Sequence, residues 1–246
     1  MKAMILAAGL GTRLRPLTDD RPKALVEIGD RTLLEITLHR LRAFGIHEVI
    51  INTHHFADMI AAYLEANHDF GMRIEISREE TLLDTGGGLK KASSFFLEDS
   101  SQLDEPLILH NVDVISTIDL GRMVGFHVEN HALATLAVQE RETFRYLLFD
   151  EQFQLCGRQS EEKTELIHPL ARPQARGFCG IHVISARIFS MMVEDGVFSI
   201  IPCYLRLAEQ GERILGFRAD KYYWRDLGRR ENVAQAAQDL KQKVLL

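Results

Sequence analysis

A short apolar strand followed at once by a glycine-rich loop is the feature that most restricts how this chain can fold. The run Ala3-Met4-Ile5-Leu6 suits a buried parallel strand, and Gly9 and Gly11 follow it. Open α/β sheets bind ligands at the carboxyl ends of their strands, where this loop begins. Glycines let backbone N–H groups approach an anion, and Arg13 and Lys23 add two cations. The pattern predicts a polyphosphate site at the edge of an α/β sheet.

Two better-known phosphate motifs do not match the loop. The dinucleotide fingerprint needs a third glycine where Leu14 stands, which argues against an NAD-dependent oxidoreductase. The P-loop needs Gly-Lys-Ser/Thr after four spacer residues, and that sequence is absent. The structural alternative is an ordinary glycine-rich turn between a strand and a helix, with its cations in solvent.

The longer run resembles the signature of the sugar-phosphate nucleotidyltransferases, the NDP-sugar pyrophosphorylases. In that family Gly-x-Gly-Thr-Arg is followed by Pro-Leu-Thr and then by Pro-Lys. This chain has Gly9-Leu10-Gly11-Thr12-Arg13, then Pro16-Leu17-Thr18, then Pro22-Lys23. The resemblance spans essentially the whole chain. It implies Mg²⁺-dependent transfer of a nucleoside monophosphate from an NTP to a sugar 1-phosphate, with release of pyrophosphate.

Length and composition agree with an enzyme domain. The chain has 246 residues and a net charge of −6, which makes a broad nucleic-acid footprint unexpected. Cys156, Cys179 and Cys203 form no disulfide framework or zinc motif, and neither a signal peptide nor a membrane span is expected, so we expect a cytoplasmic protein. We expect one nucleotidyltransferase domain over 1–246, with a nucleotide-binding half at about 1–132 and a sugar-phosphate half at about 133–246.

Hydrophobic periodicity predicts alternating strands and helices. Thr32 with Glu35 predicts a helix start, a second helix is expected over 57–66, and strands are expected at 47–52, 72–76 and 107–109. Strands at 133–139, 146–149 and 179–184 follow without long helices between them, and helical patterns return at 185–193, 199–210 and 229–243. The pattern predicts an α/β fold with a mainly parallel, doubly wound sheet. The resemblance makes it Rossmann-like, of the nucleotide-diphospho-sugar transferase type, with an additional partly antiparallel acceptor-side region.

Three consecutive glycines follow Asp84 and Thr85. Glycines suit an element interior poorly, so Gly86, Gly87 and Gly88 are expected where the backbone lies against a ligand at the start of a helix. The alternative is a plain helix start capped by Thr85. In the resembling family a similar segment packs against base, ribose and sugar, and Asp84 replaces its usual glycine.

Two carboxylates at strand ends are candidate Mg²⁺ ligands. Asp113 lies in Asn111-Val112-Asp113, where the family has Gly-Asp, so Val112 departs from the pattern. Asp226 lies in Trp224-Arg225-Asp226-Leu227-Gly228, which resembles the family's Trp-x-Asp-x-Gly. The alternative for Asp226 is an N-cap-like residue in a strand-to-helix turn.

The resemblance also implies roles for individual residues. Arg13 and Lys23 are the implied catalytic cations, Arg13 for the leaving pyrophosphate and Lys23 for charge near the α-phosphate. Asp113 and Asp226 are the implied metal ligands. The implied sugar contacts are Asn111, Gly180 and Asp226, and the implied nucleotide contacts are Leu6, Ala7, Ala8, Gly9, Gly11, Thr12, Glu79, Thr85, Gly86 and Gly87.

The base depends on Glu79, which stands where relatives that transfer uridylyl or thymidylyl groups often present a glutamine. A carboxylate only accepts hydrogen bonds, and guanine offers two adjacent donors, so Glu79 by itself favours GTP. The whole-chain resemblance is closest to compact uridylyl-transferring members, and UTP is therefore the favoured substrate. The alternatives are a GTP- or CTP-using enzyme acting on another phosphorylated sugar or small alcohol, and an inactive nucleotide-sugar-binding protein, which only Val112 and Asp84 favour.

Several other residues have plain structural interpretations. His127 and His131 have helical spacing but no HExxH motif, and we interpret both as core or surface histidines, like His54 and His55. Cys179 is expected to be a buried, inert thiol. Glu162-Lys163 is the nearest match to the Glu-Lys-Pro motif of glucose-type relatives, but Thr164 stands in place of the proline, so the motif is incomplete.

Overall fold

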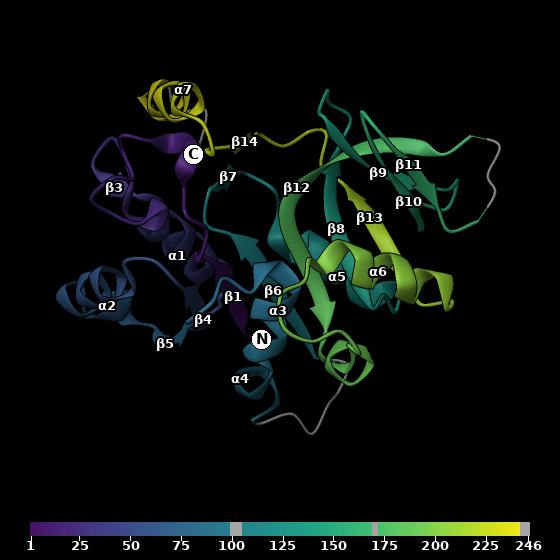
Figure 1. Ribbon diagram of the computed structural model, residues 1–246, viewed down its shortest axis with the longest axis horizontal. Helices are drawn as coiled ribbons and strands as arrows, with labels where there is room; N and C mark the ends of the chain where they lie inside the picture. The colour runs from purple at the N-terminus through teal and green to yellow at the C-terminus, as the bar shows by residue number, and fades with distance from the viewer. Residues whose placement is uncertain (99–104, 169–171, 242–246) are drawn as a thin grey trace. The chain divides into compact units, whose positions relative to one another are not determined.

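The computed structural model describes residues 1–98, 105–168 and 172–241, and the chain forms two compact units (Figure 1). Unit 1 comprises Met1–Leu83, Leu109–Ile118 and the chain from Tyr222 onward. Unit 2 comprises Asp84–Ile108 and Asp119–Lys221. The expected division near residue 132 does not coincide with these units. The C-terminal segment belongs with the N-terminal one because its strand pairs with Val114–Ser116.

Unit 1 is built on the parallel strands that the N-terminal pattern predicts. Strand β1 pairs with β4, placing Ala3 opposite Val49, and β4 pairs in parallel with β5. Strand β6 (Pro106–Asn111) begins in unit 2 and ends in unit 1. The other elements of unit 1 are β1 (Ala3–Leu6), η1 (Thr12–Leu14), η2 (Lys23–Leu25), β2 (Glu27–Ile28), β3 (Arg31–Thr32), α1 (Leu33–Ala43), β4 (Glu48–Thr53), α2 (Ala57–Ala66), η3 (His68–Gly71), β5 (Arg73–Arg78), β7 (Val114–Ser116), β14 (Trp224–Asp226) and α7 (Arg230–Lys241).

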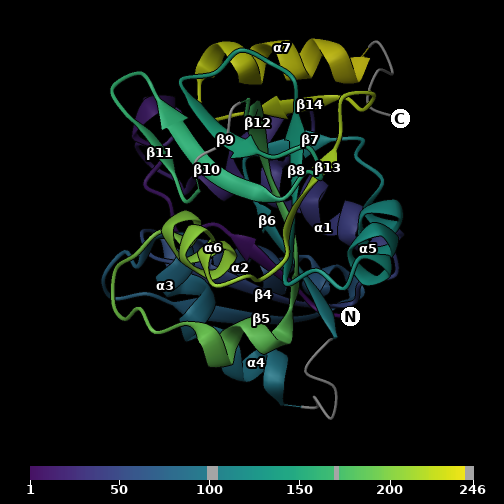
Figure 2. The same cartoon turned by 90° about the vertical axis from the view of Figure 1, so that its right-hand side faces the viewer.

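The helices of unit 1 begin close to where the sequence predicts. Thr32 caps α1 by accepting a hydrogen bond from the Glu35 N–H at 3.1 Å, and leucines fill the buried face of the helix. Helix α2 has the expected bounds. Helix α7 lies along β14 (Figure 2), and the last two residues of the helix expected over 229–243 lie outside the described residues.

Unit 2 contains the expected antiparallel region. Strand β12 pairs antiparallel with β8 and β9, β9 with β10, and β10 with β11, while β13 runs parallel to β8. Helix α5 contacts β8 and β12, α6 contacts β10 and β13, and the two helices lie on opposite sides of these strands (Figure 2). The elements are α3 (Asp84–Lys91), α4 (Ser93–Leu97), α5 (Leu120–Glu129), β8 (Ala134–Gln139), β9 (Arg145–Phe149), β10 (Leu155–Ser160), β11 (Thr164–Leu166), β12 (Gln174–Ser185), η4 (Ala186–Met191), α6 (Ile200–Glu209) and β13 (Ile214–Arg218).

The hydrophobic pattern of the sequence does not predict every element of unit 2 correctly. Strand β10 has Gly157 near its middle and weak strand propensity, yet a Cβ there would lie 2.4 Å from the Glu165 carbonyl oxygen, so close pairing with β11 requires the glycine. The helical pattern expected at 185–193 forms the short 3₁₀ helix η4 instead. Among the helices of the described residues, none combines the length and the apolar character needed to cross a membrane.

Candidate active site

The glycine-rich loop after β1 has a defined shape and an open face. Gly11 has φ +65°, and a Cβ there would lie 3.0 Å from Thr18 Cγ2, so the position needs glycine. The Thr18 hydroxyl donates to the Gly11 carbonyl at 2.9 Å, and Leu14 anchors the loop in the core. A Cβ on Gly9 would meet nothing within 4 Å. Contacts with Thr18 and the core therefore fix the loop, while Gly9 faces open space.

Unit 1 brings the two loop cations to the two predicted metal ligands. The Lys23 ammonium donates to Asp113 Oδ2, and the two side chains are only 14% and 12% exposed. Arg13 lies beside Gly228, where an added Cβ would be 2.9 Å from Arg13 Nη2 and 2.8 Å from Asp226 Oδ1. Residues that are far apart in the sequence thus form one cluster of alternating charge.

The two carboxylates lie on neighbouring backbone segments. Asp226 ends β14 opposite Val114 of β7, and the Leu227 N–H donates to the Asp113 carbonyl at 2.7 Å. Asp226 Oδ1 accepts from the Gly228 N–H at 2.7 Å. Within the described residues, the second oxygen of each carboxylate has no hydrogen-bond donor. These free oxygens fit Mg²⁺, which takes one or two protein carboxylates and fills its remaining positions with water and phosphate.

The described residues form no larger cluster of metal-binding side chains around these two carboxylates. In the part of the chain that the structure describes, no group of three or more histidine, cysteine, aspartate or glutamate side chains could hold a metal ion. Two carboxylates with free oxygens fit Mg²⁺, which keeps several waters and binds through one or two carboxylates, better than they fit a structural zinc site.

Glu79 has a structural environment that the sequence did not suggest. It is 4% exposed, and its two oxygens accept hydrogen bonds from Asn52 Nδ2 at 2.8 Å and from the Leu83 N–H at 2.9 Å. Asn52 Oδ1 in turn accepts from the Ala7 N–H at 2.7 Å. Glu79 therefore connects the ends of three strands to the start of the glycine-rich loop. Asn52 was missed, although a polar residue ending a buried strand is a usable signal.

A cavity of about 550 Å³ borders this network in unit 1. His54 lies at its edge and its Nδ1 is 2.8 Å from the Glu79 carbonyl oxygen. The cavity is lined by His54, Phe56, Ala57, Asp58, Met59, Arg78, Glu79 and Glu80. Its position at the ends of β4 and β5 suits a nucleotide base.

Arg40 braces the segment that carries Asp113, and it too was missed. Its guanidinium donates to Ser116 Oγ at 2.7 Å and to the Ile118 carbonyl, and lies 3.2 Å from His110 Nε2. Burial lowers the pKa of Arg40 to about 10, so the group stays charged at neutral pH. These partners lie on both sides of Asp113, and the contacts hold the turn between β6 and β7.

The three glycines lie at the start of a helix, as the sequence predicts. They are buried in the first turns of α3, which begins at Asp84. The reason is Phe198, whose ring atom Cε2 would be 2.3 Å from a Cβ on Gly86. The Phe198 carbonyl accepts from the N–H groups of Gly86 and Gly87 at 2.9 and 3.1 Å, and Thr85 Oγ1 accepts from the Ile200 N–H at 3.0 Å.

Asp84 stands at φ +60°, which explains why a glycine is usual there. Aspartate tolerates this left-handed conformation better than most residues because its side chain bonds locally. Here Asp84 Oδ1 accepts from the Thr85 N–H at 2.6 Å. The substitution is therefore accommodated.

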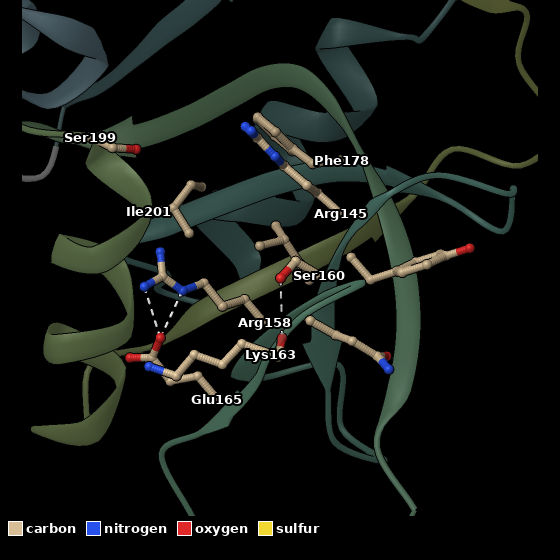
Figure 3. A pocket seen from close by; sticks show the side chains of 11 residues that line it. Arg145, Arg158, Ser160, Lys163, Glu165, Phe178, Ser199 and Ile201 are labelled. Atoms are coloured by element: carbon tan, nitrogen blue, oxygen red, sulfur yellow. Dashed lines mark hydrogen bonds and ion pairs between the residues drawn. The ribbon is translucent and has the colours of Figure 1, made fainter.

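Unit 2 holds a second candidate region, a cavity of about 400 Å³ between β9, β10, β12 and the start of α6 (Figure 3). Arg158 donates to Glu165 Oε2 through Nε at 2.8 Å, and Lys163, from the pair nearest to the Glu-Lys-Pro motif, lies on the same side. Gly180 is on β12 with φ +72°, where the register shifts. The lining is Arg145, Tyr146, Leu147, Arg158, Gln159, Ser160, Lys163, Glu165, Phe178, Ser199 and Ile201.

The structure separates the predicted site residues by unit. Asn111, Asp113, Asp226, Glu79 and the loop belong to unit 1, whereas Thr85, Gly86, Gly87 and Gly180 belong to unit 2. The amides of Gly86 and Gly87 already donate to Phe198, so a ligand contact there would use other atoms.

The interpretations of His127 as a core histidine and of Cys179 as a buried thiol are confirmed. His127 is 2% exposed, with its ring nitrogens 2.9 Å from Thr135 Oγ1 and 3.0 Å from Ser185 Oγ. Burial raises the pKa of the Cys179 thiol to about 12, and it raises those of Cys156 and Cys203 to about 11 and 12. Such thiols are unreactive at neutral pH.

Comparison with known proteins gives independent evidence for the family to which the chain belongs. Residues 2–154 match the family model described as nucleotidyl transferase. The chain is 34% identical over 235 residues to N-acetylmuramate alpha-1-phosphate uridylyltransferase of Caulobacter vibrioides, covering 92% of this chain and 91% of the relative. It is 30% identical over 248 residues to mannose-1-phosphate guanylyltransferase of Mycobacterium tuberculosis, covering 97% of this chain but 64% of that protein.

The fold agrees with solved structures. HddC from Yersinia pseudotuberculosis, complexed with GMP-PN, superposes with a TM-score of 0.75 at 22% identity, over 97% of this chain and 99% of that one. This likeness confirms the predicted α/β fold.

Proposed function

Because the chain belongs to the nucleotidyl transferase family and its relatives are sugar-1-phosphate nucleotidyltransferases, we propose that it transfers a nucleoside monophosphate from UTP to a sugar 1-phosphate. The observation that carries the proposal is the charge cluster of unit 1, in which Lys23 meets Asp113 and Arg13 lies beside Asp226. A cluster of this kind neutralises a polyphosphate and positions it without forming a covalent intermediate.

Asp113 and Asp226 would hold Mg²⁺, which when bound supplies charge neutralisation at the phosphates. The protein's own residues do the rest. The backbone of the Gly9–Gly11 loop faces the β- and γ-phosphates, and Lys23 stabilises charge at the α-phosphate. An oxygen of the acceptor phosphate forms a bond to the α-phosphorus, the bond from the α-phosphorus to the bridging oxygen breaks, and pyrophosphate leaves with that electron pair beside Arg13. The acceptor is already an anion, so no strong base is required.

The cavity of unit 2 is the proposed acceptor site. Arg145 and Lys163 offer two cations with no carboxylate partner within the described residues, whereas Arg158 is paired with Glu165 (Figure 3). Each of these cations can pair with the phosphate of a sugar phosphate. Phe178 and Ile201 supply apolar surface for the face of a sugar ring. Asn111, Gly180 and Asp226, the sugar contacts that the family resemblance implies, do not line this cavity and stay predictions.

Replacement of the loop cations tests their roles. We expect Arg13→Ala and Lys23→Ala each to lower kcat on the order of 10²-fold, with a smaller rise in the KM for the NTP, because charge at the phosphates is greatest in the transition state. Steady-state kinetics with varied NTP measure both. Arg15→Ala is the matched control, since Arg15 is an exposed cation of the same loop that pairs with Asp19 at 3.4 Å. A rise in KM with unchanged kcat would show that Arg13 and Lys23 bind the substrate and the transition state equally, and would contradict their catalytic role.

The base is the finer part of the proposal. The Caulobacter relative is a uridylyltransferase, whereas the Mycobacterium relative is a guanylyltransferase and the Yersinia structure holds GMP-PN. Both Glu79 oxygens already accept protein hydrogen bonds, which weakens the case for direct guanine reading by this side chain. UTP is therefore preferred here, and GTP is the second candidate.

A substrate panel decides the reaction and the base. Pyrophosphate release is measured for each NTP against N-acetylmuramic acid 1-phosphate, glucose 1-phosphate and mannose 1-phosphate, with and without Mg²⁺. We expect turnover only with Mg²⁺ and the highest kcat/KM with UTP. A higher kcat/KM with GTP would replace UTP in the proposal. Nucleotide-sugar binding without turnover in any combination would identify a binding protein instead.

A further inference from the structure

We propose that Phe198 is a positioning residue that connects helix α3 to the wall of the acceptor cavity and sets the KM for the sugar phosphate. The inference rests on the proposed function, because it assumes that the cavity of unit 2 binds the acceptor. Every residue that carries it lies in unit 2.

The ring of Phe198 occupies the place that a side chain at position 86 would take. A Cβ on Gly86 would lie 2.3 and 2.5 Å from two ring carbons and 3.0 Å from the Phe198 carbonyl oxygen. Real Cβ atoms do not approach other atoms so closely, so Gly86 and Phe198 are complementary. The glycine is explained by this packing without any ligand.

Hydrogen bonds hold the same segment through its backbone. The Phe198 carbonyl accepts from the N–H groups of Gly86 and Gly87, and the Ile200 N–H donates to Thr85 Oγ1 at 3.0 Å. Three bonds and one ring thus fix residues 198–200 against α3. The N–H groups at a helix start otherwise lack partners, so these bonds also satisfy α3.

The fixed segment leads directly into the cavity wall. Ser199 precedes α6 and Ile201 lies in its first turn, and both side chains line the cavity of about 400 Å³ (Figure 3). Phe198 itself does not line it. Its effect on the acceptor is therefore indirect: loss of the ring frees residues 198–200 and moves the wall that Ser199 and Ile201 form.

The test is a kinetic comparison of Phe198→Ala and Phe198→Leu with the wild type. We expect the KM for the sugar 1-phosphate to rise about tenfold in Phe198→Ala and less in Phe198→Leu, while the KM for the NTP stays within about twofold. The matched control is Phe189→Ala. Phe189 is another half-buried phenylalanine of unit 2, which stacks on Phe96 at 5.7 Å and is neither a neighbour of Gly86 nor part of the cavity lining.

A double variant tests the contact itself. Gly86→Ala alone should raise the acceptor KM, because its methyl group displaces the ring. In Gly86→Ala combined with Phe198→Ala the effects should be less than additive, since the ring is gone and only the Phe198 carbonyl oxygen, 3.0 Å away, still crowds the methyl group. Equal rises in both KM values, additive effects in the double variant, or an equal rise in Phe189→Ala would overturn the role of Phe198.

Direct binding separates this inference from the proposed function. Calorimetric titration of sugar 1-phosphate into the whole protein requires no turnover, and Phe198→Ala should bind about tenfold more weakly than the wild type. If the wild type turns over and both proteins bind the sugar phosphate equally, only the inference fails. If the wild type neither turns over nor binds any sugar phosphate, both the proposed function and the inference fail.

Discussion

Asp113→Asn and Asp226→Asn are each expected to lower kcat on the order of 10³-fold, because a metal held by two carboxylates contributes several kcal/mol to the transition state. Both variants should fold. An asparagine at 113 can still accept from the Lys23 ammonium, and one at 226 can still accept from the Gly228 N–H. Each change removes one negative charge and leaves the shape almost unaltered.

The measurement combines pyrophosphate release with Mn²⁺ titration followed by electron paramagnetic resonance in the presence of the NTP. Metal affinity should fall in both variants. Asp69→Asn is the matched control, a carboxylate of the same unit at φ +49° in turn η3, a conformation that asparagine also tolerates. Wild-type turnover in a folded variant would remove that residue from the metal site. Lost turnover with unchanged Mn²⁺ affinity would assign the carboxylate another role.

Acid is expected to destabilise unit 2 through His182. This residue of β12 is 1% exposed, and its Nδ1 lies 3.0 Å from the Tyr204 hydroxyl. Burial lowers the pKa of His182 from 6.5 to about 3, because the interior does not solvate the imidazolium. Below about pH 6.5 the unfolded chain therefore binds one proton more than the folded chain. Stability present above that pH is lost as the pH falls toward 3, on the order of 5 kcal/mol in total.

The variant His182→Gln isolates this contribution. Glutamine does not titrate and can still bond to the Tyr204 hydroxyl. The free energy of unfolding is measured by urea denaturation between pH 6.5 and 4. Its slope against pH should be smaller in His182→Gln than in the wild type, by the amount that corresponds to about one bound proton. His47→Gln, at an exposed histidine, should keep the wild-type slope. Equal slopes in His182→Gln and wild type would show that His182 is protonated in the folded state.

The phosphate loop illustrates how much the sequence alone predicts. The apolar run of β1, the glycines after it and the Thr32 cap of α1 depend on neighbours a few residues away. Their conformations follow from steric limits and local hydrogen bonds, so pattern identifies them. The family signature adds Asp113 and Asp226, and the pairing of β14 with β7 then brings Asp226, on β14, beside Asp113, in the turn that precedes β7.

The glycines of α3 show what only the tertiary structure decides. Their sequence predicts a helix start whose backbone lies against a ligand. The structure has the helix start, and it packs Gly86 against Phe198 of a distant segment. Asn52 and Glu79 likewise take their partners from other strands. The local sequence pattern indicates which backbone conformations are allowed. A buried N–H group or carboxylate also needs a hydrogen-bond partner, and the tertiary fold supplies it. That partner comes from distant parts of the chain, so packing and not local sequence determines the surroundings of Gly86 and Glu79.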